Sequence, residues 1–360
     1  MATASINSRN VISIGNRIVG DETPCLIIAE IGLNHNGNAE LAKKIIDAAA
    51  EAGADAVKFQ TFSTDEFLAD KECTYTYYHP DGTKIIENQY EMFKRLELPY
   101  NCYLTLRDHA VSKGLLFISS TADQMAVDLL DELNAPAFKL ASEDIINISL
   151  LEYLSKKKRP VIISTGMADL VEIEQAVNIL RKNVLSDLVL LHCVSLYPTP
   201  PRSCNMRKIL SLKAHFNVPV GFSDHTEGID AAVTAIALGA CVVEKHFTLD
   251  HSLPGPDHKF SADPDEFRTM VEKIRLIEMM LGSKELAFDP SEETGRIEFR
   301  RSIRARNHIL SGEIITKDML SYKRPGHGLK PYQQHLIVGK KAVREITPDE
   351  LILLPDVSHE

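Results

Sequence analysis

The sequence of 360 residues predicts a (β/α)₈ barrel of the TIM type, followed by a small β-rich domain. Eight short apolar runs alternate with segments of helical periodicity over about 250 residues, which is the count expected of such a barrel. From about residue 297 the pattern changes to short β-type pieces separated by turns. An open, doubly wound sheet is the competing interpretation, but no glycine-rich phosphate loop follows the first apolar run. We therefore expect the closed barrel.

The candidate strands are apolar on both faces and rich in Val, Ile and Phe, as is typical of a buried parallel sheet. They are Leu26–Ile31, Ala56–Phe59, Leu115–Ser119, Ala137–Leu140, Val161–Ser164, Val189–Val194, Val218–Phe222 and Cys241–Phe247. The candidate helices are Ala39–Ala52, Tyr103–Lys113, Gln124–Leu133, Ser149–Lys157, Leu170–Arg181, Asn205–His215, Gly228–Leu238 and Pro264–Leu281. Gly114 and Gly239 follow two of these helices, and Asp263 precedes another, in agreement with known preferences at helix ends.

Four domain segments follow from this pattern. Residues 1–24 contain an alternating run broken by Gly15-Asn16, which predicts a β-hairpin over the bottom of the barrel. Residues 25–282 form the barrel, with a long Tyr-rich insert at 62–100 that we expect on the catalytic face. Residues 283–296 have the composition of a linker, and residues 297–360 form the second domain. Its β-type pieces are Arg301–Ala305, Gly312–Ile315, Leu336–Gly339 and Leu351–Leu354.

The composition excludes several classes of protein. A net charge of −10 without a basic stripe argues against a nucleic-acid partner. The longest apolar stretch, residues 231–243, is too short to span a bilayer, so we expect no membrane association. The first residues have no charged segment followed by an apolar block, which predicts a cytoplasmic protein without a secretion signal. The six cysteines form no C-x-x-C pair, so we expect reduced thiols rather than disulfides or a zinc site.

Ionisable and hydroxyl side chains follow the ends of all eight candidate strands. In chain order they are Glu30, Lys58 with Gln60, Ser119 with Ser120 and Thr121, Lys139 with Ser142, Ser164 with Thr165, Ser195 with Tyr197, Ser223 with His225, and Glu244 with His246. Each alone has an ordinary explanation, such as a helix cap or a surface charge. Barrels of this kind collect their active sites at the carboxyl ends of the strands. The coincidence at one rim therefore favours a single site.

The residue types at this rim indicate the chemistry. Two lysines, a group of hydroxyls and the backbone N–H groups of helix starts suit a phosphate and a carboxylate. His225 and His246 can hold a divalent ion and leave coordination positions open for water and substrate. The rim thus predicts a phosphorylated carboxylate that reacts with a metal-polarised carbonyl group.

Several motifs in fixed order resemble those of the sialic acid synthase family over nearly the whole chain. They are Ile27-Ile-Ala-Glu-Ile-Gly-Leu-Asn-His-Asn-Gly37, Val57-Lys-Phe-Gln60, Phe138-Lys-Leu-Ala-Ser142, Ile162-Ile-Ser-Thr-Gly-Met167, Gly221-Phe-Ser-Asp-His225, Val243-Glu-Lys-His-Phe-Thr248 and Gly255-Pro-Asp-His258. The C-terminal part, with Tyr322–Gly328 and Val338–Lys341, resembles the family's antifreeze-like (SAF, β-clip) domain. These enzymes make nine-carbon 2-keto sugar acids.

The resemblance implies that phosphoenolpyruvate condenses with the open-chain aldehyde of an N-acetylmannosamine-type sugar and releases phosphate by C–O cleavage. His225 and His246 then bind the metal, Mn²⁺ or Mg²⁺ with Co²⁺ as an alternative, and Glu30 places a proton or water near the new hydroxyl. The matching positions around phosphoenolpyruvate are Lys58, Ser120, Lys139, Ser142, Ser164, Ser195 and Ser223. Those around the sugar are Gln60, Tyr197, Glu244 and Asp257. Arg324 matches an arginine that reaches into the partner's barrel, which implies a domain-swapped homodimer.

The identity of the acceptor stays open at this point. Gly255–His258 resembles the neuraminate and legionaminate branches more than the pseudaminate branch. We expect N-acetylneuraminate as product, with N,N'-diacetyllegionaminate from 2,4-diacetamido-2,4,6-trideoxymannose as the alternative. A 6-phosphorylated acceptor, as for N-acetylneuraminate-9-phosphate synthase, is more remote. So is a Schiff-base aldolase that uses Lys58 or Lys139. Ice binding by the C-terminal domain is disfavoured because Lys323, Arg324 and His327 give it a charged face.

Overall fold

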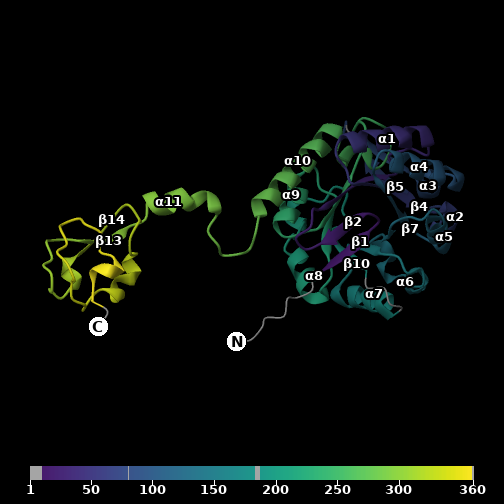
Figure 1. The fold of residues 1–360 in the computed structure, drawn as a ribbon. Coiled ribbons are helices and arrows are strands. Elements are labelled where there is room, and N and C mark those ends of the chain that lie inside the picture. Colours follow the sequence, from purple (N-terminus) through teal and green to yellow (C-terminus); the bar gives the residue numbers. More distant parts are fainter. Residues whose placement is uncertain (1–9, 80, 183–186, 359–360) are drawn as a thin grey trace. The chain divides into compact units, whose positions relative to one another are not determined.

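The computed structural model describes residues 10–79, 81–182 and 187–358, and the chain divides into two compact units (Figure 1). The first unit is Met1–Gly282 and the second is Ser283–Glu360. Residues 1–9, on which the expectation of no secretion signal depends, lie outside the described residues, as do the last two residues of the second unit.

The first unit is built around a closed parallel barrel, which confirms the predicted fold and excludes the open sheet. Its strands are β3 (Leu26–Gly32), β4 (Ala56–Thr61), β7 (Leu116–Thr121), β8 (Phe138–Leu140), β9 (Val161–Ser164), β10 (Leu188–Cys193), β11 (Val220–Asp224) and β12 (Val242–His246). The last strand pairs with the first, with His246 opposite Glu30. Almost every residue of these strands is buried, because helices cover the outer face and side chains fill the interior.

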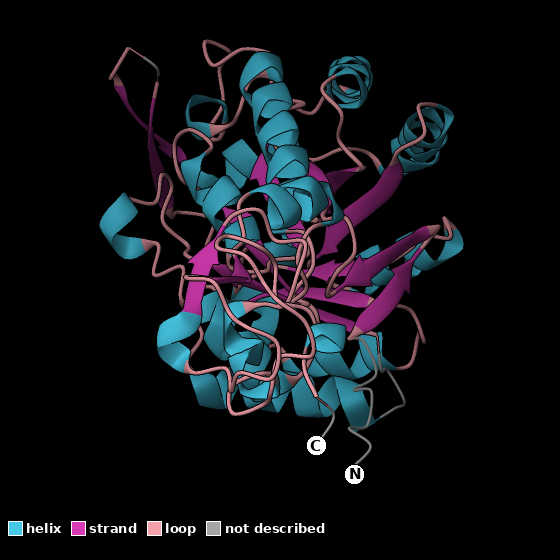
Figure 2. Ribbon diagram, turned by 60° about the vertical axis from the view of Figure 1, so that its left-hand side comes forward, coloured by secondary structure: helices cyan, strands magenta, loops and turns pink. Residues whose placement is uncertain are grey.

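Helices surround the barrel strands (Figure 2). They are α1 (Ala39–Glu51), α4 (Tyr100–Ser112), α5 (Gln124–Glu132), α6 (Ile148–Ser155), α7 (Leu170–Lys182), α8 (Lys208–Phe216), α9 (Asp230–Ala237) and α10 (Pro264–Leu281). Two of them begin later than the sequence predicts. Asn205 and Gly228 were expected as first helical residues, but their φ angles are +47° and +73°. A right-handed helix requires a negative φ, so neither residue can belong to it.

A β-hairpin closes the amino-terminal end of the barrel. It consists of β1 (Val11–Ile14) and β2 (Arg17–Gly20), paired antiparallel. Ile14 and Val19 are fully buried and pack in one cluster with Leu26 of β3 and Leu191 of β10. Burial of apolar side chains at this end is favourable by about 1.5–3 kcal/mol each. The bottom of the barrel is therefore a packed apolar plug, and polar side chains gather at the opposite end.

The insert that follows β4 is an ordered structure of its own. It contains α2 (Thr64–Phe67), the hairpin of β5 (Thr74–Tyr78) and β6 (Lys84–Asn88), and α3 (Gln89–Leu96). Phe62, Met92 and Leu96 pack with Leu33 in a separate apolar cluster. That cluster attaches the insert to the carboxyl end of β3, at the same end of the barrel as the polar rim.

The second unit is a small β-rich domain, as predicted. After α11 (Glu293–Glu298), β13 (Ser302–Ala305) pairs antiparallel with β14 (Leu320–Lys323) over a buried apolar core. The predicted pieces at 312–315 and 351–354 contribute only isolated bridges, at Ile314 and Leu351. Leu336 ends a 3₁₀ helix (Pro331–Leu336) instead of starting a strand. In so short a domain, loops carry much of the backbone hydrogen bonding.

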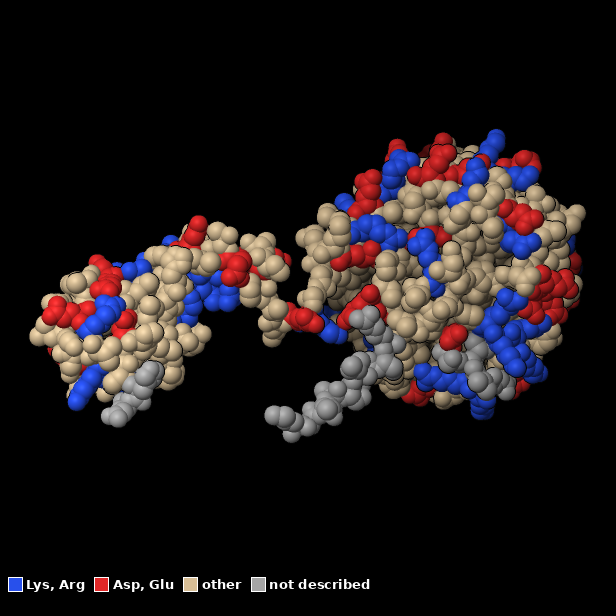
Figure 3. Space-filling model, in the orientation of Figure 1, with Lys and Arg blue, Asp and Glu red and all other residues tan. Residues whose placement is uncertain are grey.

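Basic and acidic side chains are interspersed over the visible face of the first unit (Figure 3). None of the helices within the described ranges has the length and apolarity needed to cross a membrane. All six cysteines are free, and Cys25, Cys193, Cys204 and Cys241 are buried.

Candidate active site

A cavity of about 540 Å³ lies at the carboxyl end of the barrel strands. The strand ends bring most of the sequence-predicted rim residues into its wall. Ser119 and Thr165 do not line it, and Arg324 belongs to the second unit. The predicted residues that line the cavity are Glu30, Lys58, Gln60, Ser120, Lys139, Ser142, Ser164, Ser195, Tyr197, Ser223, His225, Glu244, His246 and Asp257. Residues from all eight strands or the loops directly after them therefore meet in one place.

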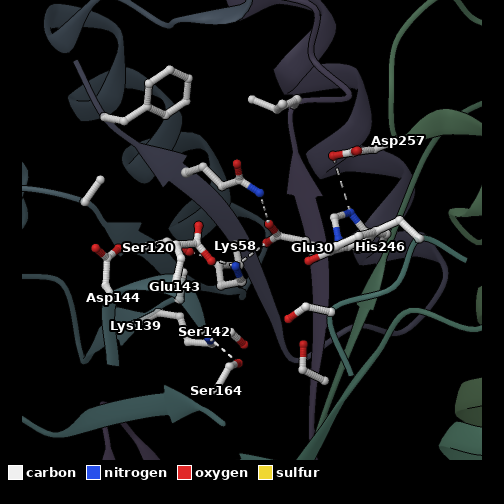
Figure 4. Close-up of a pocket in the computed structure, with 18 of the residues that line it drawn as sticks. Glu30, Lys58, Ser120, Lys139, Ser142, Glu143, Asp144, Ser164, His246 and Asp257 are labelled. Carbon is white, nitrogen blue, oxygen red and sulfur yellow. Dashed lines mark hydrogen bonds and ion pairs between the residues drawn. The ribbon is translucent and has the colours of Figure 1, made fainter. Parts of the chain in front are cut away.

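Lys58 is the centre of a buried charge cluster (Figure 4). Its Nζ lies 2.9 Å from Glu30 Oε2 and 3.8 Å from Glu244 Oε1, and it donates a hydrogen bond to Ser120 Oγ at 2.9 Å. Burial opposes the charge on Lys58, but the two carboxylates outweigh it and raise the pKa of the ammonium. Lys58 is therefore a cation at neutral pH.

The two carboxyl groups beside Lys58 have different acidities. Burial raises the pKa of Glu30 to about 7, although the Lys58 ammonium acts in the opposite direction. Burial also acts against ionisation of Glu244, but there Lys58 and Lys139 prevail and lower its pKa. Gln60 Nε2 donates to Glu30 Oε1 at 3.0 Å and thereby orients that carboxyl group. Two neighbouring carboxyls with separated pKa values are suited to one acid–base role and one charge-stabilising role.

Lys139 lies in a cradle of hydroxyl groups. Its Nζ donates to Ser164 Oγ at 2.6 Å and to the carbonyl oxygen of Leu140 at 2.8 Å. Burial lowers the pKa of this ammonium. The N–H of Gly166 donates to Ser142 Oγ at 3.1 Å, and a Cβ on this glycine would lie only 2.4 Å from Ser195 Oγ. Only glycine thus leaves room for hydroxyls and backbone N–H to converge, which is an arrangement that suits an anion.

His225 and His246 face each other across the ends of β11 and β12, with ring centroids 5.5 Å apart. His225 Nδ1 lies 2.9 Å from the carbonyl oxygen of Val194. Because a carbonyl only accepts, Nδ1 carries a proton, and the neutral ring has its lone pair on Nε2. Burial opposes a charge on His225, but Cys193, whose Sγ lies 3.8 Å from Nδ1, helps to raise its pKa. Burial and the neighbouring His225 hold the pKa of His246 well below its usual range. In its neutral form, each ring therefore offers a nitrogen lone pair.

The donor set at the histidine pair fits a divalent cation. His246 Nδ1 is buried without a hydrogen-bond partner among the described residues, and it lies 3.8 Å from Asp257 Oδ2. Tyr197 stacks on His225, with ring centroids 4.2 Å apart. Imidazole nitrogens with a nearby carboxylate are common ligands of Mn²⁺, Co²⁺ and Zn²⁺.

A second group of His, Asp and Glu side chains lies at the start of α10. His251, Asp263 and Glu266 bring their ligand atoms within 4.8 Å of one another. Asp263 and Glu266, however, form the capping box of α10 and accept hydrogen bonds from its first backbone N–H groups. This arrangement explains the cluster as a helix cap with an attached histidine.

The outer wall of the cavity is apolar and comes from the insert. Phe62, Phe67, Met92 and Phe93 line it, and the rings of Phe62 and Phe93 meet edge to face at 5.5 Å. Tyr75 of β5 lines the same side. The sequence predicts the Tyr-rich insert, including Tyr75, near the site, but it does not identify the phenylalanines or Met92, because the folding of an insertion depends on contacts that no strand periodicity reveals.

Glu143 and Asp144 also line the cavity and were absent from the sequence-predicted set. They follow Ser142 directly in the 3₁₀ helix Glu143–Ile146, so their position after a strand end was the available signal. Burial and the adjacent Glu143 raise the pKa of Asp144 to about 7. The cavity thus combines a cationic, hydroxyl-rich floor with carboxyl groups and an apolar wall.

The chain is similar to known proteins over nearly its whole length. Residues 45–286 match the NeuB family and residues 300–358 match the SAF domain. The chain is 42% identical to the N,N'-diacetyllegionaminic acid synthase of Legionella pneumophila, over 93% of this chain and 95% of that protein. Its identity to the enzyme of the same name from Campylobacter jejuni is 41%, over 91% and 98% of the two chains.

A solved structure gives the same likeness. The crystal structure of N-acetylneuraminic acid synthetase from Leptospira borgpetersenii, in complex with citrate, superposes with a TM-score of 0.72. It is 36% identical in sequence, and the superposition covers 80% of this chain and 95% of that one.

The raised pKa of Asp144 predicts a stability that depends on pH. The folded-state pKa of about 7 lies above the ordinary value of 3.8, so ionisation favours unfolding. In the wild-type protein, the loss in free energy of unfolding caused by ionisation of Asp144 grows from about pH 4 to about pH 7 and is constant above that range. Asp144→Asn removes it and should raise the free energy of unfolding at pH 8 by about 1–2 kcal/mol, after allowance for solvent screening. Urea unfolding at pH 4 and pH 8 tests this, and an equal effect at both values would contradict it.

Proposed function

This chain belongs to the NeuB family of phosphoenolpyruvate-condensing sugar acid synthases, and from that membership we propose which reaction it catalyses. Phosphoenolpyruvate condenses with the open-chain aldehyde of an N-acylated, unphosphorylated mannosamine-type sugar, and phosphate is released. One observation carries the proposal. A buried anion cradle around Lys139 and a pair of metal-competent imidazoles, His225 and His246, open into the same cavity.

The cradle binds phosphoenolpyruvate through charge and hydroxyl groups. Lys58 and Lys139 supply two ammonium groups at the floor, and Ser120 and Ser164 already accept hydrogen bonds from them. The N–H of Gly166 donates to Ser142 Oγ and thereby holds this hydroxyl group in the cradle. Charge-assisted hydrogen bonds of this kind are about twice as strong as neutral ones, and they orient C3 of phosphoenolpyruvate toward the aldehyde.

The reaction balances with the groups at hand. A C–C bond forms between C3 of phosphoenolpyruvate and the aldehyde carbon, and the aldehyde oxygen takes a proton to become a hydroxyl group. Water adds at the cationic C2 and loses one proton to become a hydroxyl group. The C2–O bond to phosphate then breaks as this hydroxyl passes its proton to the leaving phosphate, which leaves a ketone and hydrogen phosphate. Glu30, with a pKa of about 7, is the group that delivers or receives these protons. The anionic Glu244 faces the positive charge that develops at C2.

His225 and His246 would hold a divalent ion, Mn²⁺ or Mg²⁺ with Co²⁺ as an alternative, and the remaining ligands would be substrate and water. Such an ion supplies Lewis-acid polarisation of the aldehyde oxygen when bound. The hydrogen bond from His225 Nδ1 to Val194 and the neutrality of His246 leave ring nitrogens available for it.

The cavity wall bears on the choice of acceptor. The apolar side chains of Phe62, Met92 and Phe93 suit a deoxy carbon and the methyl groups of N-acetyl substituents. Among the described residues of the cavity, only Lys58 and Lys139 carry a permanent positive charge, and both lie in the phosphoenolpyruvate cradle. Within the barrel cavity, a sugar 6-phosphate would therefore lack a cationic partner. We favour 2,4-diacetamido-2,4,6-trideoxymannose, which yields N,N'-diacetyllegionaminate, and keep N-acetylmannosamine, which yields N-acetylneuraminate, as the second candidate.

Phosphate release from phosphoenolpyruvate tests the proposal directly. Three acceptors are offered separately with Mn²⁺: 2,4-diacetamido-2,4,6-trideoxymannose, N-acetylmannosamine and N-acetylmannosamine 6-phosphate. We expect the largest kcat/KM with the first, by about tenfold or more, since a misplaced methylene or hydroxyl in an apolar pocket costs about 1–3 kcal/mol. The 6-phosphate should be the poorest acceptor.

Two controls belong to that experiment. EDTA should abolish phosphate release and Mn²⁺ should restore it, whereas borohydride should not inactivate the enzyme in the presence of either substrate. Inactivation by borohydride would instead indicate a Schiff-base aldolase with Lys139 as nucleophile. No phosphate release with any of the three acceptors would overturn the proposed function.

We further propose that Arg324 of a second copy completes the sugar site in a domain-swapped homodimer. Arg324 is exposed, and its guanidinium group lies 5.4 Å from the ring centre of Phe299. Met279 and Met280 near the end of α10 are 73% and 75% exposed, an amount of apolar surface that favours association with another chain.

Substitution of Arg324 separates the two substrates. Arg324→Ala should raise KM for the sugar about tenfold or more, because a charged donor to the N-acyl oxygen is lost, and should leave KM for phosphoenolpyruvate within about twofold. The neighbouring Lys323→Ala serves as matched control, because Lys323 is also exposed and pairs with Asp349. A parallel rise in both KM values, or the same effect in the control, would contradict this role.

A further inference from the structure

The two metal-competent histidines each have a charged neighbour that does not line the cavity. Asp224 precedes His225 and Lys245 precedes His246. Successive residues of a strand point to opposite faces. Ser223, His225, Glu244 and His246 face the cavity, whereas Asp224 and Lys245 point away from it. Both residues belong to the motifs that contain the histidines, Gly221–His225 and Val243–Thr248, but the proposed reaction uses neither.

Asp224 and Lys245 form a buried ion pair behind the histidines. They are direct partners in the register of β11 and β12, and Lys245 Nζ lies 3.0 Å from Asp224 Oδ2. Their side chains are 0% and 1% exposed. Breaking such a pair is costly, and forming it is not obviously favourable, because both charges lose their hydration. A packed apolar pair would fill this space without the loss of hydration. The charged pair therefore indicates that its directional hydrogen bonds are needed here.

The pair also fixes the chain that carries His225. Asp224 Oδ1 accepts hydrogen bonds from both the N–H and the hydroxyl of Thr226, each at 2.8 Å. Lys245 Nζ in turn donates to the carbonyl oxygen of Thr226 at 2.5 Å. Residues 224 and 226 are thus bound on either side of His225, and the anchor for both is the residue before His246.

The strand register gives this network its consequence. His225 lies beyond the last paired residue of β11, where the ladder no longer determines the backbone, while His246 is still within β12. The cross-strand pair continues the connection past the end of the ladder. It thereby ties the backbone at His225 to the backbone at His246 and limits the distance between the two rings.

We propose that Asp224 and Lys245 are positioning residues that hold His225 and His246 at the separation needed for a divalent cation. This role rests on the proposed function, because it presumes that the histidine pair binds the metal. Neighbouring groups that orient metal ligands typically change metal affinity about 10–100-fold when they are removed. The pair should therefore determine metal affinity without determining the affinity for phosphoenolpyruvate.

The test uses the double variant Asp224→Asn/Lys245→Met, which removes both charges and leaves no unpaired charge buried. Mn²⁺ binding to the metal-free, full-length protein is measured by calorimetry, together with phosphoenolpyruvate binding in EDTA and the unfolding temperature. We expect a loss of Mn²⁺ affinity of about tenfold or more, with phosphoenolpyruvate affinity within about twofold. Thr226→Val, which removes only a hydroxyl, should weaken Mn²⁺ binding a few-fold and carries the test if the double variant does not fold.

The control is a partly buried ion pair at the other end of the same barrel, with Arg275 32% exposed. Asp55 lies 2.6 Å from Arg275, and Asp55→Asn/Arg275→Met should lower the unfolding temperature but leave Mn²⁺ affinity unchanged. Unchanged Mn²⁺ affinity in the Asp224/Lys245 and Thr226 variants, or an equal loss in the control, would overturn the positioning role. Absence of Mn²⁺ binding by the unmodified protein would overturn this role and the metal site together. Mn²⁺ binding without phosphate release from any acceptor would overturn the proposed reaction alone.

Discussion

Closure of the barrel is the constraint on which the active site depends. Glu244 lies on the last strand and Glu30 on the first, and these strands are neighbours only because the sheet closes on itself. Lys58 of β4 reaches both carboxyl groups from the adjacent strand. A buried ammonium without such partners would be strongly unfavourable, so the closed sheet and the charge cluster require each other. At the opposite end, the apolar hairpin plug fills the interior of the barrel.

The same burial that weakens stability prepares the site for reaction. Removal from water brings the pKa values of Glu30 and Asp144 to about 7, within reach of proton transfer at neutral pH, and keeps His246 neutral. Lys139 is held by hydroxyl and carbonyl oxygens instead of a carboxylate, so an incoming anion need not displace a counter-ion. On the outer side of the strands, the buried Asp224–Lys245 pair has a different role: it fixes the backbone that carries the histidines and does not adjust the acidity of a reacting group.

The strands and their polar ends could be predicted because strands of a buried parallel sheet have a simple sequence pattern. Each is an apolar run followed by polar side chains at the rim. Features that depend on backbone exceptions or distant contacts could not. Because φ of Asn205 is positive, α8 begins later in the chain than predicted. The wall formed by Phe62 and Met92 depends on the tertiary contacts of the insert. Asp224 and Lys245 are adjacent to predicted ligands in sequence, but their pairing requires the strand register, which no single strand contains.

The central claim is that this cavity joins phosphoenolpyruvate to an aldehyde and releases phosphate by breaking the C2–O bond. Phosphoenolpyruvate labelled with ¹⁸O in the oxygen that bridges C2 and phosphorus tests the claim most directly. Phosphorus NMR of the released phosphate distinguishes labelled from unlabelled product. Addition of water at C2 predicts that the label leaves with phosphate, while the keto oxygen of the sugar acid comes from solvent. Label retained in the keto group would mean cleavage at phosphorus and would contradict the account.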